Sequence, residues 1–257
     1  MIVRPFLQVL SLLFTFSLSS IVSAEAKQPL RIAVSSNFTP VLKQLLVEFN
    51  QQTNIDTQII SGATGALFLQ IKHGAPFDIF IAADSVRPNQ LEQEQLTLAD
   101  SRQTYALGRL ALLSLNNSAK LIDLHTLPAR FAIANPDTAP YGKAAKQTLA
   151  HLGLWQQYQP KLIQGININQ TFTQVRSQAV PSGLVAYSQL VLNNLSGAII
   201  PADYHQPISQ QLVIIKKSNN IKQAKQLSKY LLSAQVQQKI VSFGYASFTQ
   251  NQKGVSK

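Results

Sequence analysis

The stretch LRIAVSSNFTPVLKQLLVEFNQQTNIDTQIISGATG, residues 30–65, contains one local pattern twice. In each copy a run typical of a strand, residues 30–34 or 57–60, leads into a turn of small polar residues and then into a helical pattern. Thr39 followed by Pro40 predicts the N-cap and the first position of the first helix. Residues 78–83 form a third predicted strand, so two crossovers predict an open parallel sheet. Asp84, directly after it, is expected to cap a helix over residues 86–94.

The two turns carry polar side chains that could meet a ligand. Ser36 and Asn37 follow the first strand, and Thr64, beside Ala63, follows the second. Such sheets bind ligands beyond the carboxyl ends of their strands, where helix amino ends offer unpaired N–H groups and a positive dipole end. Hydroxyl and amide donors at both turns therefore predict a small oxyanion. The alternative is that Asn37 and Thr64 are ordinary turn and cap residues, which need no ligand.

The strand–turn–helix pattern restarts in the second half of the chain. A strand over residues 130–134, a long turn and a helix over 143–152 are followed by a second turn at 165–169 and a buried strand at 182–187. A last strand and two helices, within residues 211–243, are expected to return to the first lobe. The sequence thus predicts an α/β protein of two three-layered lobes: residues 25–107 with 208–257, and residues 108–207.

Residues 1–24 differ from the rest of the chain. Arg4 gives a positive start, residues 6–18 are mostly apolar, and Val22-Ser23-Ala24 is a small-residue cleavage site. This predicts a signal peptide, cleaved after Ala24 or after Ala26. A retained membrane anchor is the alternative, but the apolar stretch contains polar residues and is shorter than a membrane span. We therefore expect an exported protein.

Composition excludes several classes of site. The chain has no cysteine, which rules out disulfides, thiolate metal sites and cysteine nucleophiles. Its formal net charge of +11 raises the question of nucleic acid, but the one local concentration of lysines lacks interleaved aromatic residues and fits a solvated helix face better. We expect no nucleic-acid partner. The four histidines are scattered without a metal-binding spacing, so neither a cofactor nor a direct protein–metal ligand is expected.

Several segments together resemble a known family. Residues 74–84, GAPFDIFIAAD, are similar to a segment of the periplasmic molybdate-binding proteins that supply ABC importers. Shorter similar pieces follow in the same order: Asn135-Pro136 with Pro140 and Gly142, Pro181 with Gly183, and Phe243-Gly244-Tyr245. The resemblance covers nearly all of the chain after the signal peptide. It implies a type II periplasmic binding protein fold and a soluble, monomeric receptor, not an enzyme, that delivers molybdate or tungstate to a membrane permease.

The resemblance also implies which residues bind the ligand. The family's first ligand position, a serine or in one subgroup an asparagine, falls on Asn37 beside Ser36, and the donor of the second turn falls on Thr64 beside Ala63. Backbone donors are implied at Tyr141 and Ile168. Many members carry a tyrosine at the position matching Ala186, whereas here Tyr187 is one residue out of register and should point to the other face. The Tyr141 hydroxyl could replace that donor, or Tyr141 could only pack across the cleft.

Molybdate at neutral pH carries two charges and no proton, so its partners must be hydrogen-bond donors, and its molybdenum would be held through the oxygens. Hydrogen phosphate needs an acceptor that a shell of donors lacks. Sulfate differs mainly in size, so a receptor for sulfate or phosphate remains an alternative. A secreted hydrolase is a weaker one, because the turn at residues 61–65 has neither the spacing of a P-loop nor that of a nucleophile elbow.

Overall fold

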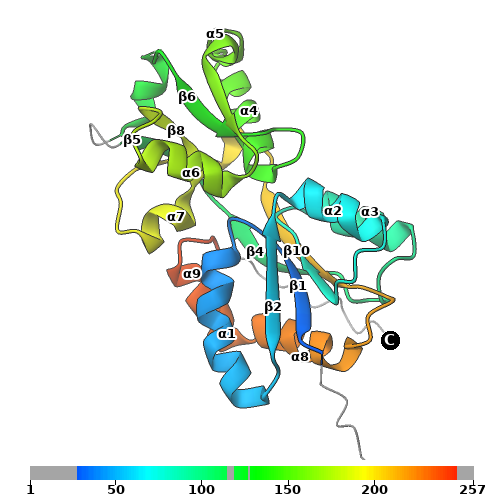
Figure 1. The fold of residues 1–257 in the computed structure, drawn as a ribbon. Helices are drawn as coiled ribbons and strands as arrows, with labels where there is room; N and C mark the ends of the chain where they lie inside the picture. The colour runs from blue at the N-terminus through cyan, green and yellow to red at the C-terminus, as the bar shows by residue number, and fades with distance from the viewer. Residues whose placement is uncertain (1–27, 115–118, 127, 248–257) are drawn as a thin grey trace, which may run out of the picture.

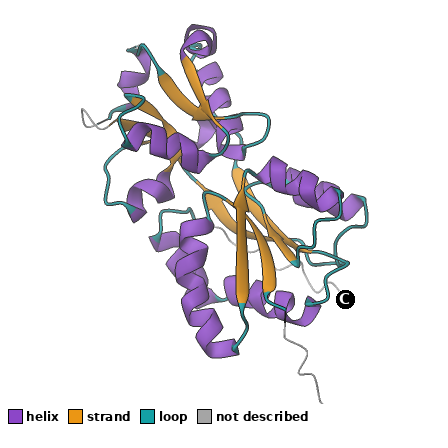
Figure 2. Cartoon of the chain, viewed as in Figure 1, coloured by secondary structure: helices purple, strands orange, loops and turns teal. Residues whose placement is uncertain are grey.

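The computed structural model describes residues 28–114, 119–126 and 128–247. The predicted signal peptide, residues 1–24, and the alternative cleavage position after Ala26 lie outside the described residues. Within the described part, two five-stranded sheets form two lobes, each with helices on both faces of its sheet (Figures 1 and 2). This is the predicted two-lobed α/β fold. Among the described helices none is long and apolar enough to span a membrane.

The sheet of the first lobe has the order β2-β1-β3-β10-β4. β1 pairs in parallel with both β2 and β3, which confirms the predicted parallel sheet and its crossovers. β10 then runs antiparallel to β3 and to β4, a strand that the sequence pattern did not predict. The strands are β1 (Leu30–Ser35), β2 (Thr57–Gly62), β3 (Ile79–Ile81), β4 (Gln103–Gly108) and β10 (Ile208–Ile214).

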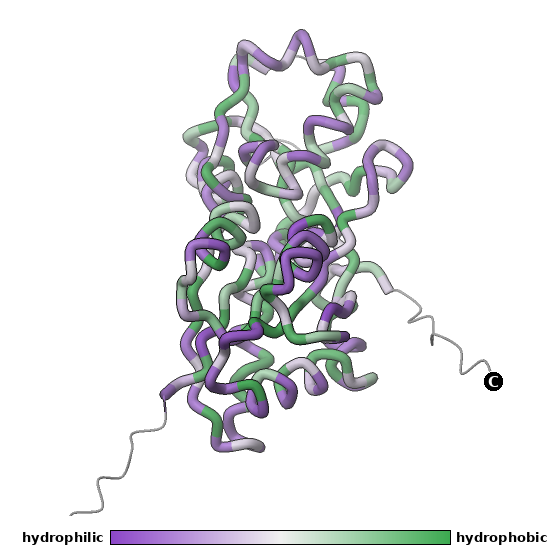
Figure 3. Tube along the Cα trace, turned by 90° about the vertical axis from the view of Figure 1, so that its right-hand side faces the viewer, coloured by the Kyte–Doolittle hydropathy of each residue, from purple (hydrophilic) through white to green (hydrophobic). Residues whose placement is uncertain are grey.

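Alternate residues of these strands supply two separate cores, one on each face of the sheet. Ile32 and Val34 pack with the helices of one face, whereas Ala33 and Phe80 pack with those of the other, because successive side chains of a strand point to opposite sides. Hydrophobic residues accordingly run through the interior of the trace, and hydrophilic residues gather in its outer turns (Figure 3). The helices are α1 (Thr39–Thr53), α8 (Ile221–Leu231) and α9 (Ala234–Ser242) on the first face, and α2 (Thr64–Lys72) and α3 (Val86–Gln93) on the second.

The two predicted helix caps of this lobe have different outcomes. The prediction that Thr39 is the N-cap of its helix is wrong, because Phe38 occupies that position and no side chain caps the helix. The Thr39 hydroxyl instead bonds to Ser61 Oγ at 2.7 Å and to the Ser35 carbonyl at 3.3 Å, which ties the ends of β1 and β2 together. Ser85 occupies the N-cap position of α3, but Asp84, one residue before it, makes the expected bond to the start of the helix, since its Oδ1 accepts from the Arg87 N–H at 3.0 Å.

The sheet of the second lobe has the order β7-β6-β8-β5-β9. Its parallel strands β7, β6 and β8 carry the second set of turns. β5 runs antiparallel to both of its neighbours, β8 and β9. The helix predicted over residues 143–152 begins earlier, at Pro140, and Tyr187 opens a helix instead of ending a strand. The strands are β5 (Leu110–Ser114), β6 (Phe131–Ala134), β7 (Leu162–Gly165), β8 (Ser182–Ala186) and β9 (Ala198–Ile199).

Helices again cover both faces of this second sheet, as Figure 2 shows. One face carries α4 (Pro140–His151) and α5 (Trp155–Tyr158), and the other carries α6 (Ile168–Arg176) and α7 (Tyr187–Leu192). Three short 3-10 turns complete the described part: η1 (Leu121–His125), η2 (Gln159–Lys161) and η3 (Ala202–Tyr204).

The chain passes between the lobes along β4 and β10, which pair with each other close to the crossing. Ile208 lies opposite Gly108, and the register shifts between Gln210 and Gln211. β5 of the second lobe begins at Leu110, two residues after β4 ends. The connection is therefore a paired ribbon with an irregularity in it, and this ribbon borders the site described next.

Candidate oxyanion-binding site

A small cavity lies where the two lobes meet. The turns after β1 and β2 supply one wall, and the amino ends of α4 and α6 supply the opposite one. All the residues singled out from the sequence line it, and each of them is at least nine-tenths buried: Ser36, Asn37, Ala63, Thr64, Tyr141 and Ile168. The structure thus brings the predicted residues together from both lobes around one space, whereas their role in binding stays a prediction.

The amino ends of three helices converge on this cavity. Their N-cap residues are Ala63 for α2, Ala139 for α4 and Asn167 for α6. The first N–H groups of a helix lack intrahelical partners, and the macrodipole adds partial positive charge at the same end. On α6 the Asn167 side chain caps the N–H of Gln170 at 3.0 Å and leaves that of Ile168 to other partners. Backbone donors from both lobes can therefore reach an anion here.

The side chains at the first-lobe turns differ in how they are paired. Thr64 Oγ1 accepts from the Ala83 N–H at 3.2 Å, so the hydroxyl proton of Thr64 is available to an anion. Asn37 Nδ2 donates to Gln210 Oε1 at 3.0 Å and to Tyr245 Oη at 3.1 Å. Two buried oxygens of these turns, Ser35 Oγ and Asn37 Oδ1, have no hydrogen-bond partner within the described part.

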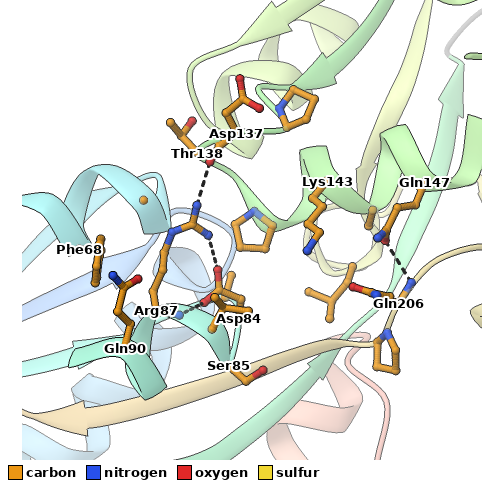
Figure 4. Close-up of a pocket in the computed structure, with 18 of the residues that line it drawn as sticks. Phe68, Asp84, Ser85, Arg87, Gln90, Asp137, Thr138, Lys143, Gln147 and Gln206 are labelled. Atoms are coloured by element: carbon orange, nitrogen blue, oxygen red, sulfur yellow. Dashed lines mark hydrogen bonds and ion pairs between the residues drawn. The ribbon is translucent and has the colours of Figure 1, made fainter. Parts of the chain in front are cut away.

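The lobes are closed over the cavity. The Gly65 N–H at the start of α2 donates to the Thr138 carbonyl at 2.9 Å, and Arg87 Nη2 donates to the Asp137 carbonyl at 2.8 Å. Figure 4 shows Arg87 of α3, held by Asp84, reaching up to this turn of the second lobe. A side chain at residue 65 would place its Cβ 3.0 Å from the Thr138 carbonyl oxygen. Glycine at this position lets the two lobes approach this closely without a shift.

The family described as bacterial extracellular solute-binding protein matches residues 30–246. The chain belongs to this family. It is 37% identical over 224 residues to the molybdate-binding protein ModA of Azotobacter vinelandii, covering 84% of this chain and 88% of that one. It is 33% identical over 220 residues to ModA of Rhodobacter capsulatus, covering 84% and 87%.

A solved structure of a similar protein has the same fold as this chain. The periplasmic molybdate-binding protein of Azotobacter vinelandii superposes with a TM-score of 0.80 and 33% identity, covering 86% of this chain and all of that one. The two-lobed type II fold expected from the sequence is therefore confirmed. The family consists of solute receptors of transport systems, so the expectation that the chain is not an enzyme is confirmed as well.

A network that sequence reasoning missed lies behind the cavity of this solute-binding protein. Gln210 of β10 is fully buried, and its Oε1 accepts from both Asn37 Nδ2 and Tyr105 Oη, the latter at 2.8 Å. Its Nε2 donates to Tyr141 Oη of the second lobe at 3.1 Å. One signal could have revealed it: Gln210 stands between Ile208 and Leu212 in the strand alternation and so shares their inward face.

The hydroxyl of Tyr141 lies at the paired ribbon of β4 and β10 between the lobes, which we call the hinge. A Cβ on Gly108 would come within 2.4 Å of the Tyr141 oxygen, so glycine at 108 is what lets the ring reach Gln210. Tyr141 packs in the same apolar cluster as Ala186. Tyr187 packs against a separate cluster on the other face of the sheet, with Arg109 stacked 4.7 Å from its ring, which confirms its predicted direction. Tyr141 and Ala186 thus share one face, as the proposed replacement of a tyrosine donor requires.

The tyrosines behind the cavity are neutral. Burial raises the pKa of each of the three tyrosines, Tyr105, Tyr141 and Tyr245, above the usual tyrosine value. The neighbouring Tyr245 raises the pKa of Tyr105 and Tyr141 further. Each phenol therefore keeps its proton at physiological pH and can donate it. Within the described residues there is no group of three or more histidine, aspartate or glutamate side chains that could hold a metal ion.

Proposed function

We propose that this solute-binding protein is a periplasmic receptor that binds molybdate, and also tungstate, and delivers it to the permease of an ABC importer. The observation that carries the proposal is the closed cavity, where hydroxyl groups and helix amino ends converge and no carboxylate is present in the lining. Both relatives and the solved structure compared above are named for molybdate binding. The periplasmic location rests on those names and on the predicted signal peptide.

The charge of the ligand is balanced without a cationic side chain. The residues that line the cavity are all uncharged, so the positive ends of the α2, α4 and α6 dipoles and several neutral donors would share the two negative charges. Such a shell favours an anion that brings no proton. Tungstate has nearly the shape and charge of molybdate, which is why we propose both. We further propose that the receptor acts as a monomer.

Oxyanion-dependent stabilisation is the first test. Molybdate and tungstate should each raise the melting temperature of the chain without its signal peptide, because a ligand that binds only the folded state stabilises it by mass action. Sulfate and phosphate at the same concentration should leave it unchanged. Differential scanning fluorimetry makes the comparison, and titration calorimetry gives the affinities. Equal stabilisation by sulfate would contradict the proposed specificity for molybdate but agree with an oxyanion site. No change in melting temperature with any of the four ions would overturn the proposal.

Thr64→Val tests the side-chain donor of the second turn. Valine keeps the shape of threonine but removes the hydroxyl, so molybdate binding should weaken by about 1–3 kcal/mol, the usual loss for one partner of a buried hydrogen bond. Thr148→Val is a matched control, because Thr148 is equally buried on α4 but its hydroxyl donates to the Ala144 carbonyl and does not line the cavity. Titration calorimetry of both variants should show a loss for Thr64 alone. Equal affinities would make Thr64 a structural residue of its turn.

A further inference from the structure

The Asn37 amide faces the hinge with its donor and leaves its acceptor without a partner. Its nitrogen donates to Gln210 and Tyr245, and its oxygen is buried and unpaired in the described part of the chain. Because the oxygen and nitrogen of an amide lie on opposite sides, a nitrogen turned to the hinge directs the oxygen away from it, and Asn37 is one of the residues that line the cavity. An acceptor in that place opposes an anion that carries no proton.

Only one of the groups around this amide has a fixed polarity. The hydroxyls of Tyr105 and Tyr141 can each donate or accept. That of Tyr245 donates to the Asn37 backbone carbonyl at 3.2 Å and accepts from Asn37 Nδ2. Gln210, in contrast, has an accepting end toward Asn37 and Tyr105 and a donating end toward Tyr141. The orientation of Gln210 therefore decides which end of Asn37 faces the hinge.

Turning both amides together gives the Asn37 side-chain oxygen a donor. Gln210 Nε2 would then donate to Asn37 Oδ1, and Gln210 Oε1 would accept the proton of the Tyr141 hydroxyl. Tyr105 keeps its bond to the Ala82 carbonyl at 3.0 Å. The Tyr245 hydroxyl, which donates to the Asn37 backbone carbonyl at 3.2 Å, would share that proton with the side-chain oxygen of Asn37. In this second arrangement the Asn37 oxygen is paired and its Nδ2 points into the cavity.

We infer that Gln210 is a positioning residue for the oxyanion site: it turns together with Asn37, so that Asn37 Nδ2 donates to an unprotonated oxyanion. The inference rests on the proposed function. It gives Gln210 a part in specificity, because the arrangement with the oxygen inward suits a protonated anion such as hydrogen phosphate and the turned arrangement suits molybdate. Gln210 also connects Asn37 to the second lobe, since its side chain is bonded to the Tyr141 hydroxyl across the hinge.

A double-mutant cycle separates this role from a merely structural one. The variants are Asn37→Ala, Gln210→Met and the double variant, with molybdate affinity measured by titration calorimetry. We expect about a tenfold loss or more for each single change, from the loss of one buried hydrogen-bonding group. If Gln210 acts through Asn37, adding Gln210→Met to Asn37→Ala should change the affinity by less than about twofold. If the affinity losses of the two single variants multiply in the double variant, the inference is overturned and the proposed function stays intact.

Two further variants sharpen the result. Gln210→Glu accepts at both ends, which locks the Asn37 nitrogen toward the hinge, so it should weaken molybdate binding more than Gln210→Met does; a smaller loss would contradict the inference. Gln211→Met is the control on the same strand, since Gln211 bonds to Arg102 and Thr104 instead, and it should bind like the original chain. Melting temperatures without ligand show whether each variant is folded. An original chain that binds none of the oxyanions would overturn the proposed function, and the inference with it.

Discussion

Asn37→Asp is expected to abolish most molybdate binding while leaving the chain folded. The new side chain has the same shape, but it replaces an amide with a carboxylate in a position that is only 1% exposed and lines the cavity. A buried negative charge beside a dianion has no compensating cation among the lining residues. An uncompensated buried charge costs about 3–5 kcal/mol, which corresponds to a loss of affinity of more than about 100-fold.

Titration calorimetry with molybdate measures this loss, and Asn37→Ala is the matched control. Alanine removes the amide without adding charge, so it should cost only about 1–3 kcal/mol. The difference between the two variants is the electrostatic part of the effect. If aspartate and alanine weakened binding equally, the ligand would not lie next to residue 37, and the site proposed here would be wrong. Melting temperatures without ligand check that both variants fold.

Gly65→Val is expected to hold the lobes apart. The Cβ alone would lie 3.0 Å from the Thr138 carbonyl oxygen and 3.1 Å from the Thr138 Cα, both backbone atoms that a side-chain rotation cannot move. The two methyl groups of valine extend further, so the bond between the Gly65 N–H and Thr138 should break and the second-lobe donors should move away from the anion. Losing two or more of those donors would cost roughly 2–6 kcal/mol of binding.

Small-angle scattering with molybdate present distinguishes the closed from the open arrangement, and calorimetry gives the affinity. Ala66→Val is the control, because residue 66 lies on the same helix but is exposed. It should close and bind like the original chain. Gly65→Ala should fall between the two, since its single carbon requires only a small shift of the lobes. Undiminished affinity in Gly65→Val would show that binding does not depend on the contact between α2 and the Thr138 turn.

The parts of the site that could be predicted are those encoded locally. Ser36, Asn37 and Thr64 follow strands directly and precede helices, so the strand–turn–helix pattern places them at one edge of a parallel sheet. Tyr141 and Ile168 needed the resemblance to the family as well, because the residues before them also fit an ordinary turn. The start of α4 at Pro140 was missed for that reason, although proline is common at the first position of a helix.

The parts that could not be predicted depend on residues far apart in sequence. Gln210 contacts Asn37, Tyr105 and Tyr141, which lie 173, 105 and 69 positions away from it. No local pattern relates these residues. Thr39 fitted the rule for an N-cap, but a hydroxyl 22 residues along the chain, that of Ser61, became its partner. Strand β4 was missed because its role, pairing with β10 at the hinge, arises only when the C-terminal part of the chain returns to the first sheet.

The uncharged lining of the cavity has a consequence for the exchange of protons. No residue around the cavity ionises near neutrality, and burial raises the pKa of Tyr105 and Tyr141 behind it. A dianion that enters therefore neither takes up nor releases a proton, and the complex carries two negative charges more than the free receptor. Loading and release of the anion are then independent of small changes in pH.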